Sequence, residues 1–327
     1  MVVETRKLQR LGSSSLVVTL PREWIKRMEL KPGDVVYLVV EGDTIRITPS
    51  NRESSSLRAE AVFKADEVKD RDLVSKAVSC LYILGYDNVL FRLPEDDIAL
   101  QNAVRMAASR LSGLEASEAM DGNITIRYLL DPSKVEVSTT IRSMGLVVSS
   151  LAKLSRKIVE GLEEREAAQS LKLLREELFR NQHMVMRFLV TGVDARRLAK
   201  PSNTYSLMIG TSLLGLIGGV LLDISQTLLE RRPKHVDVLI QALSVVEELV
   251  PVITSLLVSP SLQRSRNALK RIEETLEAVK MRVKNCRDNV ETIVLSYIYQ
   301  ALRILFIISN TILCNAIASS KYLEESG

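Results

Sequence analysis

Hydrophobic and polar positions alternate in short runs over the first fifty residues, and turns separate the runs. "SLVVTL" ends at Pro21, "DVVYLVV" follows the turn "KPGD", and "TIRITP" follows "EGD". These runs predict three short β-strands, and "REWIKRMEL" between the first two is long enough for one short helix. A β-rich unit of this size struggles to bury a core alone, so the pattern predicts that it dimerises.

Strand-like and helix-like patterns alternate from Leu57 to about Asp131. The strand-like runs are "LRAEAVF", "NVLFRL", "LEASEAM" and "ITIRYLL", and the helix-like runs are "DLVSKAVSCLYIL" and "DDIALQNAVRMAASRL". This alternation predicts a small α/β module over residues 57–131, with helices covering one face of a sheet. The serine-rich stretch "PSNRESSSL" before it has the composition of a linker.

Residues 132–327 follow the period of α-helices. Apolar residues with three-four spacing form two seams: Val137, Ile141, Met144, Val148, Leu151, Ile158 and Leu162, and then Leu269, Ile272, Leu276, Val279, Val283, Cys286 and Val290. Such seams are typical of antiparallel bundles or coiled coils. Breaks near glycines and prolines divide the region into about six helices, which group as two successive sets of three.

Two segments of this helical region are unusually apolar. Residues 202–222 contain no charged side chain, and residues 292–320 contain only Arg303. Both approach the length of a membrane span. Because polar residues interrupt both and no aromatic belts flank them, we expect each to be the buried central helix of its three-helix set, without stable membrane insertion. A true membrane protein is the alternative. The glycines of the first segment would allow close helix contact; they are Gly210, Gly215, Gly218 and Gly219.

Composition agrees with a mainly helical chain of two or three domains, since 46% of the 327 residues are hydrophobic and only 4% are aromatic. The net charge of +4 permits contact with nucleic acid without demanding it. Cys80, Cys286 and Cys314 are far apart and odd in number, so no disulfide framework or CxxC metal site is expected. A reducing cytoplasm fits this usage best, and no export signal is evident.

Positive charge gathers at the N-terminus, where Glu23 is the one acid among six basic residues: Arg6, Lys7, Arg10, Arg22, Lys26 and Arg27. Phosphate contacts supply most of the affinity in DNA binding, and the hydroxyls of Ser13, Ser14 and Ser15 can also donate to phosphates. Charge alone leaves two readings equal: a DNA contact, or a solvated basic terminus.

The order of the residues favours DNA contact. Residues 6–49 resemble the AbrB/MazE/SpoVT swapped-hairpin DNA-binding domain, with basic residues before a Gly-Ser turn, a strand ending in "LP", a short helix, "LKPGD" and two closing strands. The resemblance implies that residues 1–49 of two chains interleave into one barrel. It also implies DNA-binding roles for Arg6, Lys7, Arg10, Ser13, Ser14 and Arg22, and core positions for Leu16, Val18, Leu20, Trp24 and Leu30.

The helical region resembles the PhoU family of phosphate-uptake regulators, whose fold is two three-helix repeats in a six-helix bundle. That family ends each repeat with a helix similar to "LERIxDHxxNIA", in which the aspartate contributes to metal clusters. Here the two counterparts are "LGLIGGVLLDIS" and "LRILFIISNTIL", so Gly219 and Phe306 occupy the acid positions. We therefore expect no metal cluster and no cofactor, because too few carboxylates converge.

Enzymatic chemistry has little support in the sequence. His183 and His235 have no partner motif, "GLIGG" lacks the Lys-Ser/Thr of a phosphate loop, and no nucleophile elbow is found. The paired carboxylates are typical of solvated helix faces.

The sequence therefore predicts a multidomain, mainly α protein with an AbrB-like β-barrel head, a small α/β module and a PhoU-like bundle. This order resembles a recurring archaeal arrangement. The leading hypothesis is a cytoplasmic, homodimeric or larger DNA-binding transcription regulator, linked to phosphate uptake by resemblance. The alternative is an adaptor whose head only dimerises and whose bundle contacts a phosphate transporter subunit or a sensor kinase.

Overall fold

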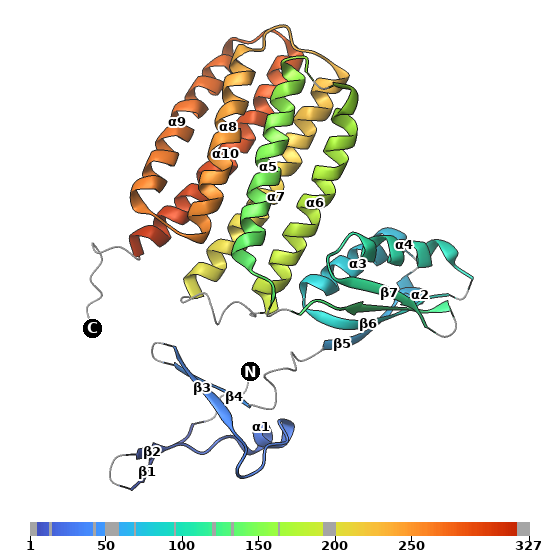
Figure 1. The fold of residues 1–327 in the computed structure, drawn as a ribbon, viewed down its shortest axis with the longest axis vertical. Helices are drawn as coiled ribbons and strands as arrows, with labels where there is room; N and C mark the ends of the chain where they lie inside the picture. Colours follow the sequence, from blue (N-terminus) through green and yellow to red (C-terminus); the bar gives the residue numbers. More distant parts are fainter. Residues whose placement is uncertain are drawn as a thin grey trace. The chain divides into compact units, whose positions relative to one another are not determined.

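The structure is a computed structural model that describes residues 5–12, 15–41, 44–49, 59–68, 70–94, 96–119, 122–131, 134–162, 164–191 and 201–318. The chain divides into two compact units, residues 1–58 and residues 59–327, which are drawn together in Figure 1 and are described separately here. The first unit, called the head below, is small and mostly β. The second is mainly helical.

The head consists of two antiparallel hairpins and one short helix. Its elements are β1 (Gln9–Leu11), β2 (Ser15–Val17), α1 (Arg22–Arg27), β3 (Val36–Glu41) and β4 (Thr44–Pro49). Gly12 follows β1 with a φ of 71°, a conformation that glycine adopts at little cost. The helix ends where the backbone N–H of Leu30 donates to the carbonyl of Ile25 at 3.1 Å. The predicted strand "SLVVTL" is regular only over Ser15–Val17.

The second unit begins with a four-stranded sheet. Its strands are β5 (Ala59–Lys64), β6 (Tyr86–Arg92), β7 (Leu114–Glu118) and β8 (Ile124–Tyr128), in the order β5-β6-β8-β7. Strands β5 and β6 are parallel, and the other pairs are antiparallel. Its helices are α2 (Ala65–Val68), α3 (Arg71–Ile83) and α4 (Ile98–Ser109). The carboxylates of Asp70 and Asp97 cap the N-termini of α3 and α4.

One face of this sheet is buried beneath α3 and α4 (Figure 1). Alternate residues of each strand point to this side, so Val89 and Phe91 of β6 join Ile124 and Ile126 of β8 in a small core. Val62 of β5 lies on the other face and is 55% exposed. The expected α/β module with helices on one face is therefore present.

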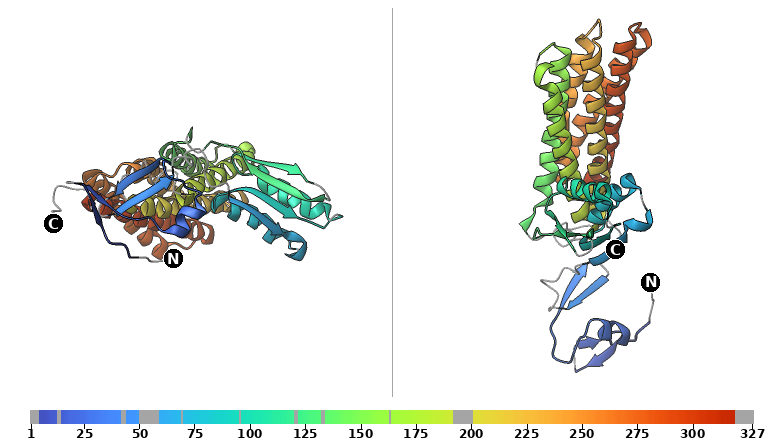
Figure 2. Two further views of the ribbon diagram at one scale, coloured as in Figure 1. Left: turned by 90° about the horizontal axis from the view of Figure 1, so that it is seen from below. Right: turned by 90° about the vertical axis from the view of Figure 1, so that its right-hand side faces the viewer.

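Six helices follow: α5 (Val137–Val159), α6 (Glu164–Thr191), α7 (Pro201–Glu230), α8 (Asp237–Val258), α9 (Leu262–Asn285) and α10 (Asn289–Ala318). They run roughly along one axis (Figure 2). Helices α5, α8, α10 and α7 pack in a ring, α6 packs on α5 and α7, and α9 packs on α8 and α10. The contacts among the first three helices are thus repeated among the last three.

Both predicted seams are largely buried in the bundle core. The first is buried from Val137 to Ile158, but Leu162 lies beyond the end of α5 and is 53% exposed. Its backbone N–H closes that helix end by donating to the carbonyl of Lys157 at 2.8 Å. The second seam is buried from Leu269 to Val279. Helix α9 ends at Asn285, so the last two residues predicted for this seam lie outside it.

The prediction for the two most apolar segments is wrong in two respects. Helix α7 is the last of the set α5–α7, and α10 is the last of the set α8–α10, so neither is the central helix of its set. Each also keeps one open face, on which Leu216 is 53% and Ile307 is 46% exposed. Among the described residues, three helices are long and apolar enough to cross a membrane by length and composition: Thr204–Glu230, Asp237–Val258 and Asn289–Ile317.

The glycines of α7 permit close packing at three of the four expected positions. A Cβ added at Gly210, Gly215 or Gly218 would overlap the side chain of Leu257, Gln182 or Leu178, respectively. Nothing lies within 4 Å of a Cβ added at Gly219, so the expectation is wrong for that residue.

Arg187 of α6 joins the sheet module to the bundle. Its side chain is 4% exposed and donates to the carbonyls of Tyr82 at 2.6 Å and Tyr86 at 3.1 Å. It also forms an ion pair with the carboxylate of Asp87, and its guanidinium lies 3.8 Å from the ring centroid of Tyr128. Three acceptors and an aromatic face therefore compensate for the burial of this charge.

We predict that Arg187→Ala destabilises the second unit by about 3 kcal/mol or more, because the largely buried carboxylate of Asp87 and the carbonyls of Tyr82 and Tyr86 each lose one charged donor. Urea denaturation followed by circular dichroism measures the change. Arg175→Ala on the exposed side of the same helix is the matched control, with an expected effect within about 0.5 kcal/mol. Equal effects of the two substitutions would show that the contacts of Arg187 contribute little to the stability of the second unit.

Candidate nucleic-acid interface

The basic residues from Arg6 to Lys31 are exposed. Arg6, Lys7 and Arg10 lie in β1 or just before it, and Arg22 and Lys26 lie on α1. Within the described part of the chain, no carboxylate forms an ion pair with Lys7, Arg10 or Arg22. These side chains are therefore available to an anionic partner.

The first hairpin fixes the position of Arg10. It pairs directly with Leu16 across the two strands, so both side chains lie on the same face of the hairpin. Leu16 is 64% exposed. Ser13 and Ser14, the other predicted site residues of this hairpin, lie outside the described residues.

Helix α1 places a second set of cations. Arg22 and Lys26 are four residues apart and so share one face of the helix. The candidate residues predicted from the sequence included Arg22 but omitted Lys26. The helical spacing alone could have identified Lys26, because "REWIKR" puts it one turn after Arg22.

The head leaves its apolar side chains largely uncovered. Leu38 and Val40 of β3 pair with Ile47 and Ile45 of β4, so all four lie on one face of the second hairpin. Leu38 is 63% and Val40 69% exposed. We call this surface, together with Val36, the β3–β4 apolar face.

The residues predicted to form the core of the head are not buried within one chain. Leu16 and Val18 are 64% and 48% exposed, and Leu20, Trp24 and Leu30 are half-buried. The physical reason is that two separate hairpins and one six-residue helix cannot enclose a core by themselves.

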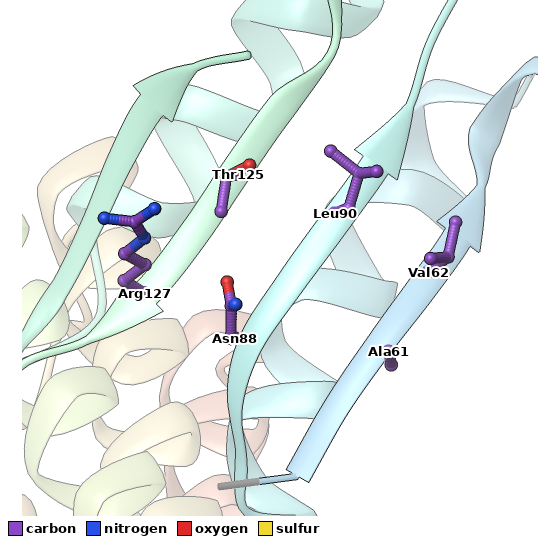
Figure 3. Close-up of a pocket in the computed structure, with 6 residues that line it drawn as sticks. All are labelled: Ala61, Val62, Asn88, Leu90, Thr125 and Arg127. Atoms are coloured by element: carbon purple, nitrogen blue, oxygen red, sulfur yellow. The ribbon is translucent and has the colours of Figure 1, made fainter.

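Two depressions lie in the surface formed by described residues of the second unit. The first is a shallow hollow of about 400 Å³ on the open face of the sheet, lined by Ala61, Val62, Asn88, Leu90, Thr125 and Arg127 (Figure 3). The second is a groove of about 640 Å³ between α3, α4 and α6, bordered by Arg71, Lys76, Arg110 and His183.

His183 is half-buried on α6, and His235 is exposed. The His183 ring stacks on Phe179, with centroids 3.8 Å apart, and its Nδ1 lies 2.8 Å from the carbonyl oxygen of Phe179. Burial lowers the pKa of His183, and the nearby guanidinium of Arg110 lowers it further. The Arg110 guanidinium lies 4.5 Å from the centroid of the Phe179 ring.

The positions at which the PhoU family carries acids are half-buried in α7 and α10. Gly219 faces open space, and Phe306 packs against the bundle core. Within the described ranges, no three His, Cys, Asp or Glu side chains gather as they would to hold a metal ion.

Comparison with known proteins supports the assignment of the head. Residues 9–55 match the family described as "Antidote-toxin recognition MazE, bacterial antitoxin". No curated protein and no solved structure matches the chain. The chain therefore contains a MazE/AbrB-like domain, which indicates an antitoxin or a DNA-binding regulator. Such domains commonly bind DNA and dimerise, and they are typically non-enzymatic.

We predict that His183 makes stability depend on pH. Its pKa in the folded state is lower than its ordinary value of 6.5, so the unfolded chain takes up the proton more readily. The neutral His183 ring makes its full contribution to the free energy of unfolding above pH 6.5. That contribution is lost progressively as the pH falls from 6.5 toward the lower pKa of the folded state.

The measurement is urea denaturation at several pH values, comparing the wild type with His183→Gln and His235→Gln. With His183→Gln, the free energy of unfolding should decrease less than in the wild type as the pH falls below 6.5. The second, at an exposed position, should retain the wild-type loss. If His183→Gln leaves the pH dependence unchanged, burial of this ring does not control it.

Proposed function

We propose that the protein is a dimeric DNA-binding transcription regulator whose heads contact DNA. The observation that carries this proposal is the match of residues 9–55 to the MazE family, over a segment that exposes a row of cations. Phosphate contacts by such cations supply much of the affinity of DNA-binding proteins. Within this proposal residues 1–49 form the DNA-binding domain, residues 57–131 the α/β module and residues 132–327 the bundle, and the chain is cytoplasmic.

The proposed DNA-binding residues are those implied by the resemblance, with Lys26 added. Arg6, Lys7 and Arg10 lead into the first hairpin, and Arg22 begins α1. Ser13 and Ser14 follow Gly12 in the sequence. Their roles follow from chemistry. Arginine forms bidentate bonds with phosphate or guanine, and the serine hydroxyls donate to phosphates without steric bulk.

Dimerisation of the head follows from its uncovered apolar surface. The β3–β4 apolar face has five side chains directed to one side, and three of them, Leu38, Val40 and Ile45, are more than 60% exposed. We propose that the head of a second chain buries this face in an interleaved barrel. A paired head doubles the number of phosphate contacts and fits a two-fold operator.

The helical bundle is proposed to sense a signal or to bind a partner protein. Its two sets of three helices repeat the same contacts, as two three-helix PhoU repeats would. A role in phosphate uptake rests on that resemblance alone.

The family match supports a second candidate, an antitoxin that pairs with a toxin protein. An adaptor that contacts a phosphate transporter subunit or a sensor kinase, without binding DNA, is the third. Affinity purification of the intact chain from its native cells separates the three. A stoichiometric small toxin favours the second, and a transporter subunit or kinase, with no DNA retained at low salt, favours the third.

We predict that Arg10→Ala combined with Arg22→Ala weakens DNA binding at every sequence tested and reduces its salt dependence. The double substitution removes four cations from a dimer. The plot of the logarithm of the association constant against the logarithm of the salt concentration should therefore become less steep, with a slope smaller in magnitude by about 3 to 4. Fluorescence anisotropy with a labelled duplex at several salt concentrations measures both effects.

The matched control is Arg175→Ala with Arg264→Ala, which changes the net charge equally at exposed positions of α6 and α9. It should leave the slope within about one unit of the wild type. DNA binding that does not weaken with salt, or equal effects of the two double variants, would refute the assignment of these residues.

We predict that Leu38→Glu raises the dissociation constant of the dimer at least about tenfold, because burial of a leucine contributes about 1.5–3 kcal/mol and a carboxylate opposes it. Analytical ultracentrifugation of the intact chain measures this constant. Leu73→Glu at an exposed position of α3, 48% exposed in the single chain, is the control. Unchanged dimerisation of the Leu38 variant would exclude the β3–β4 apolar face from the interface.

A further inference from the structure

Helices α7 and α10 share an open face that is strongly apolar. Tyr205, Ile209 and Leu216 of α7 are 69%, 47% and 53% exposed. Ile293, Ile307 and Ile317 of α10 are 47%, 46% and 46% exposed. We call these six side chains the α7–α10 strip. Helices α6 and α9 pack on the outer sides of α7 and α10 and leave the strip between them uncovered.

The opposite edge of the same bundle has a different composition. There α5 and α8 pack together, and their exposed residues include Arg142, Lys153 and Glu248. Arg156 of α5 adds ion pairs with Glu247 at 3.0 Å and with Glu160. The two edges are equivalent in helix arrangement, so the apolar character of the α7–α10 strip is not a requirement of the bundle fold.

The exposed positions of α7 have the spacing of a helix that packs along another helix. They are four, three, four and three residues apart, at Tyr205, Ile209, Ser212, Leu216 and the half-buried Gly219. This mean spacing of three and a half residues keeps a seam straight against a partner helix. Ser212 and Gly219 are small enough for a partner to approach closely. The same line of positions becomes polar at Asp223.

The dimensions of the strip fit an interface between two proteins. Two packed helices make it roughly 20 Å wide, and the apolar part is about 30 Å long, so its area is on the order of 600 Å². Each partner of a typical stable interface contributes about 800 Å². The range for such interfaces is about 600–1,000 Å² per partner, so the strip alone lies at its lower limit.

The charges at the strip favour a protein partner over a lipid surface. Arg303 of α10 lies exposed among the apolar residues, and Asp223 of α7 is exposed at the end of the seam. A second copy of this chain presents both signs of charge as well as the same apolar residues. A bilayer offers hydrocarbon without a fixed counter-charge at that depth.

We propose that the α7–α10 strip is a second interface between copies of this chain. This proposal rests on the proposed function in one respect. Paired heads hold two bundles close together and so raise the effective concentration of one α7–α10 strip for the other. The dimer is then held at two separate places, by the heads and by the bundles. A partner that binds the bundle at this face would compete with the second copy.

The test compares Leu216→Glu combined with Ile307→Glu against Leu146→Glu, which lies on the polar α5 edge and is 61% exposed. All three positions are exposed, so none of the variants introduces a charge into the core. Sedimentation of the intact chain should show a dimer dissociation constant raised by about 100-fold or more in the double variant, as expected when one of two linked contacts is lost. The control should remain within about twofold of the wild type.

A distance measurement separates this interface from the head. A spin label on Glu230→Cys, at the exposed end of α7, is introduced into a chain with Cys80→Ser and Cys314→Ser. Pulsed electron paramagnetic resonance should give one narrow distance between copies, which broadens or disappears with Leu216→Glu and Ile307→Glu. DNA binding, measured on the same samples, reports on the heads.

The outcomes are distinguishable. If the heads do not pair, the wild type still dimerises through its bundles, and the double variant becomes monomeric. If the strip does not pair, the double variant and the control have the same dissociation constant and the labels show no narrow distance. If the wild type binds vesicles of mixed anionic and neutral lipid, and the double variant loses that binding without a change in dimerisation, the occupant is lipid and the proposal is overturned.

Discussion

A single copy of this chain cannot bury all of its apolar side chains, and both units therefore keep large apolar side chains exposed. In the head, the hairpins are too short to fold over each other, so Leu16, Leu38 and Val40 are exposed. In the second unit the bundle is large enough to form a continuous core, but one edge of it remains apolar. Contiguous apolar surface of this extent is typical of an interaction site.

Arg187 determines which parts of the chain can respond together. Its guanidinium is buried and satisfies two carbonyls and one carboxylate of the sheet module, and it packs on the rings of Tyr82 and Tyr128. Burial raises the pKa of both tyrosines, and the guanidinium of Arg187 offsets part of that rise. The module and the bundle belong to one compact unit, residues 59–327, and Arg187 contacts both. The head is connected to this unit through the sequence of residues 50–58, which is rich in polar residues.

Strong periodicity explains which parts of the fold could be predicted from the sequence. The seams from Val137 to Ile158 and from Leu269 to Val279 have one polar side, so their buried faces are evident from spacing alone. The apolar segment of α7 is apolar on all sides, and such a pattern contains no information about which face lacks a neighbour. The prediction of full burial was wrong there for this reason.

Only part of the candidate site could be predicted from the sequence. The order of motifs around Arg10 and Arg22 identified the head, because turns and strand ends depend on local sequence. Arg187 could not be identified in this way, since one arginine in a helix with many charges gives no signal until a partner from another element is known. The exposure of Leu38 also required the structure, since alternation predicts a buried face without stating which chain covers it.

The separation of charge and apolar surface within the head argues for an anionic partner. The cations lie on the first hairpin and on α1, and the β3–β4 apolar face belongs to the second hairpin. Residues 1–49 carry eight basic and six acidic side chains, a net charge of +2, but six of the cations lie between Arg6 and Arg27, where Glu23 is the one acid. Pairing of two heads therefore brings two such clusters of cations into one dimer. Their mutual repulsion opposes association if the head serves only to dimerise. A polyanion such as DNA removes this repulsion, because each phosphate contact pairs a cation and releases a counterion. The same residues that weaken a purely structural dimer thus stabilise one that is bound to nucleic acid.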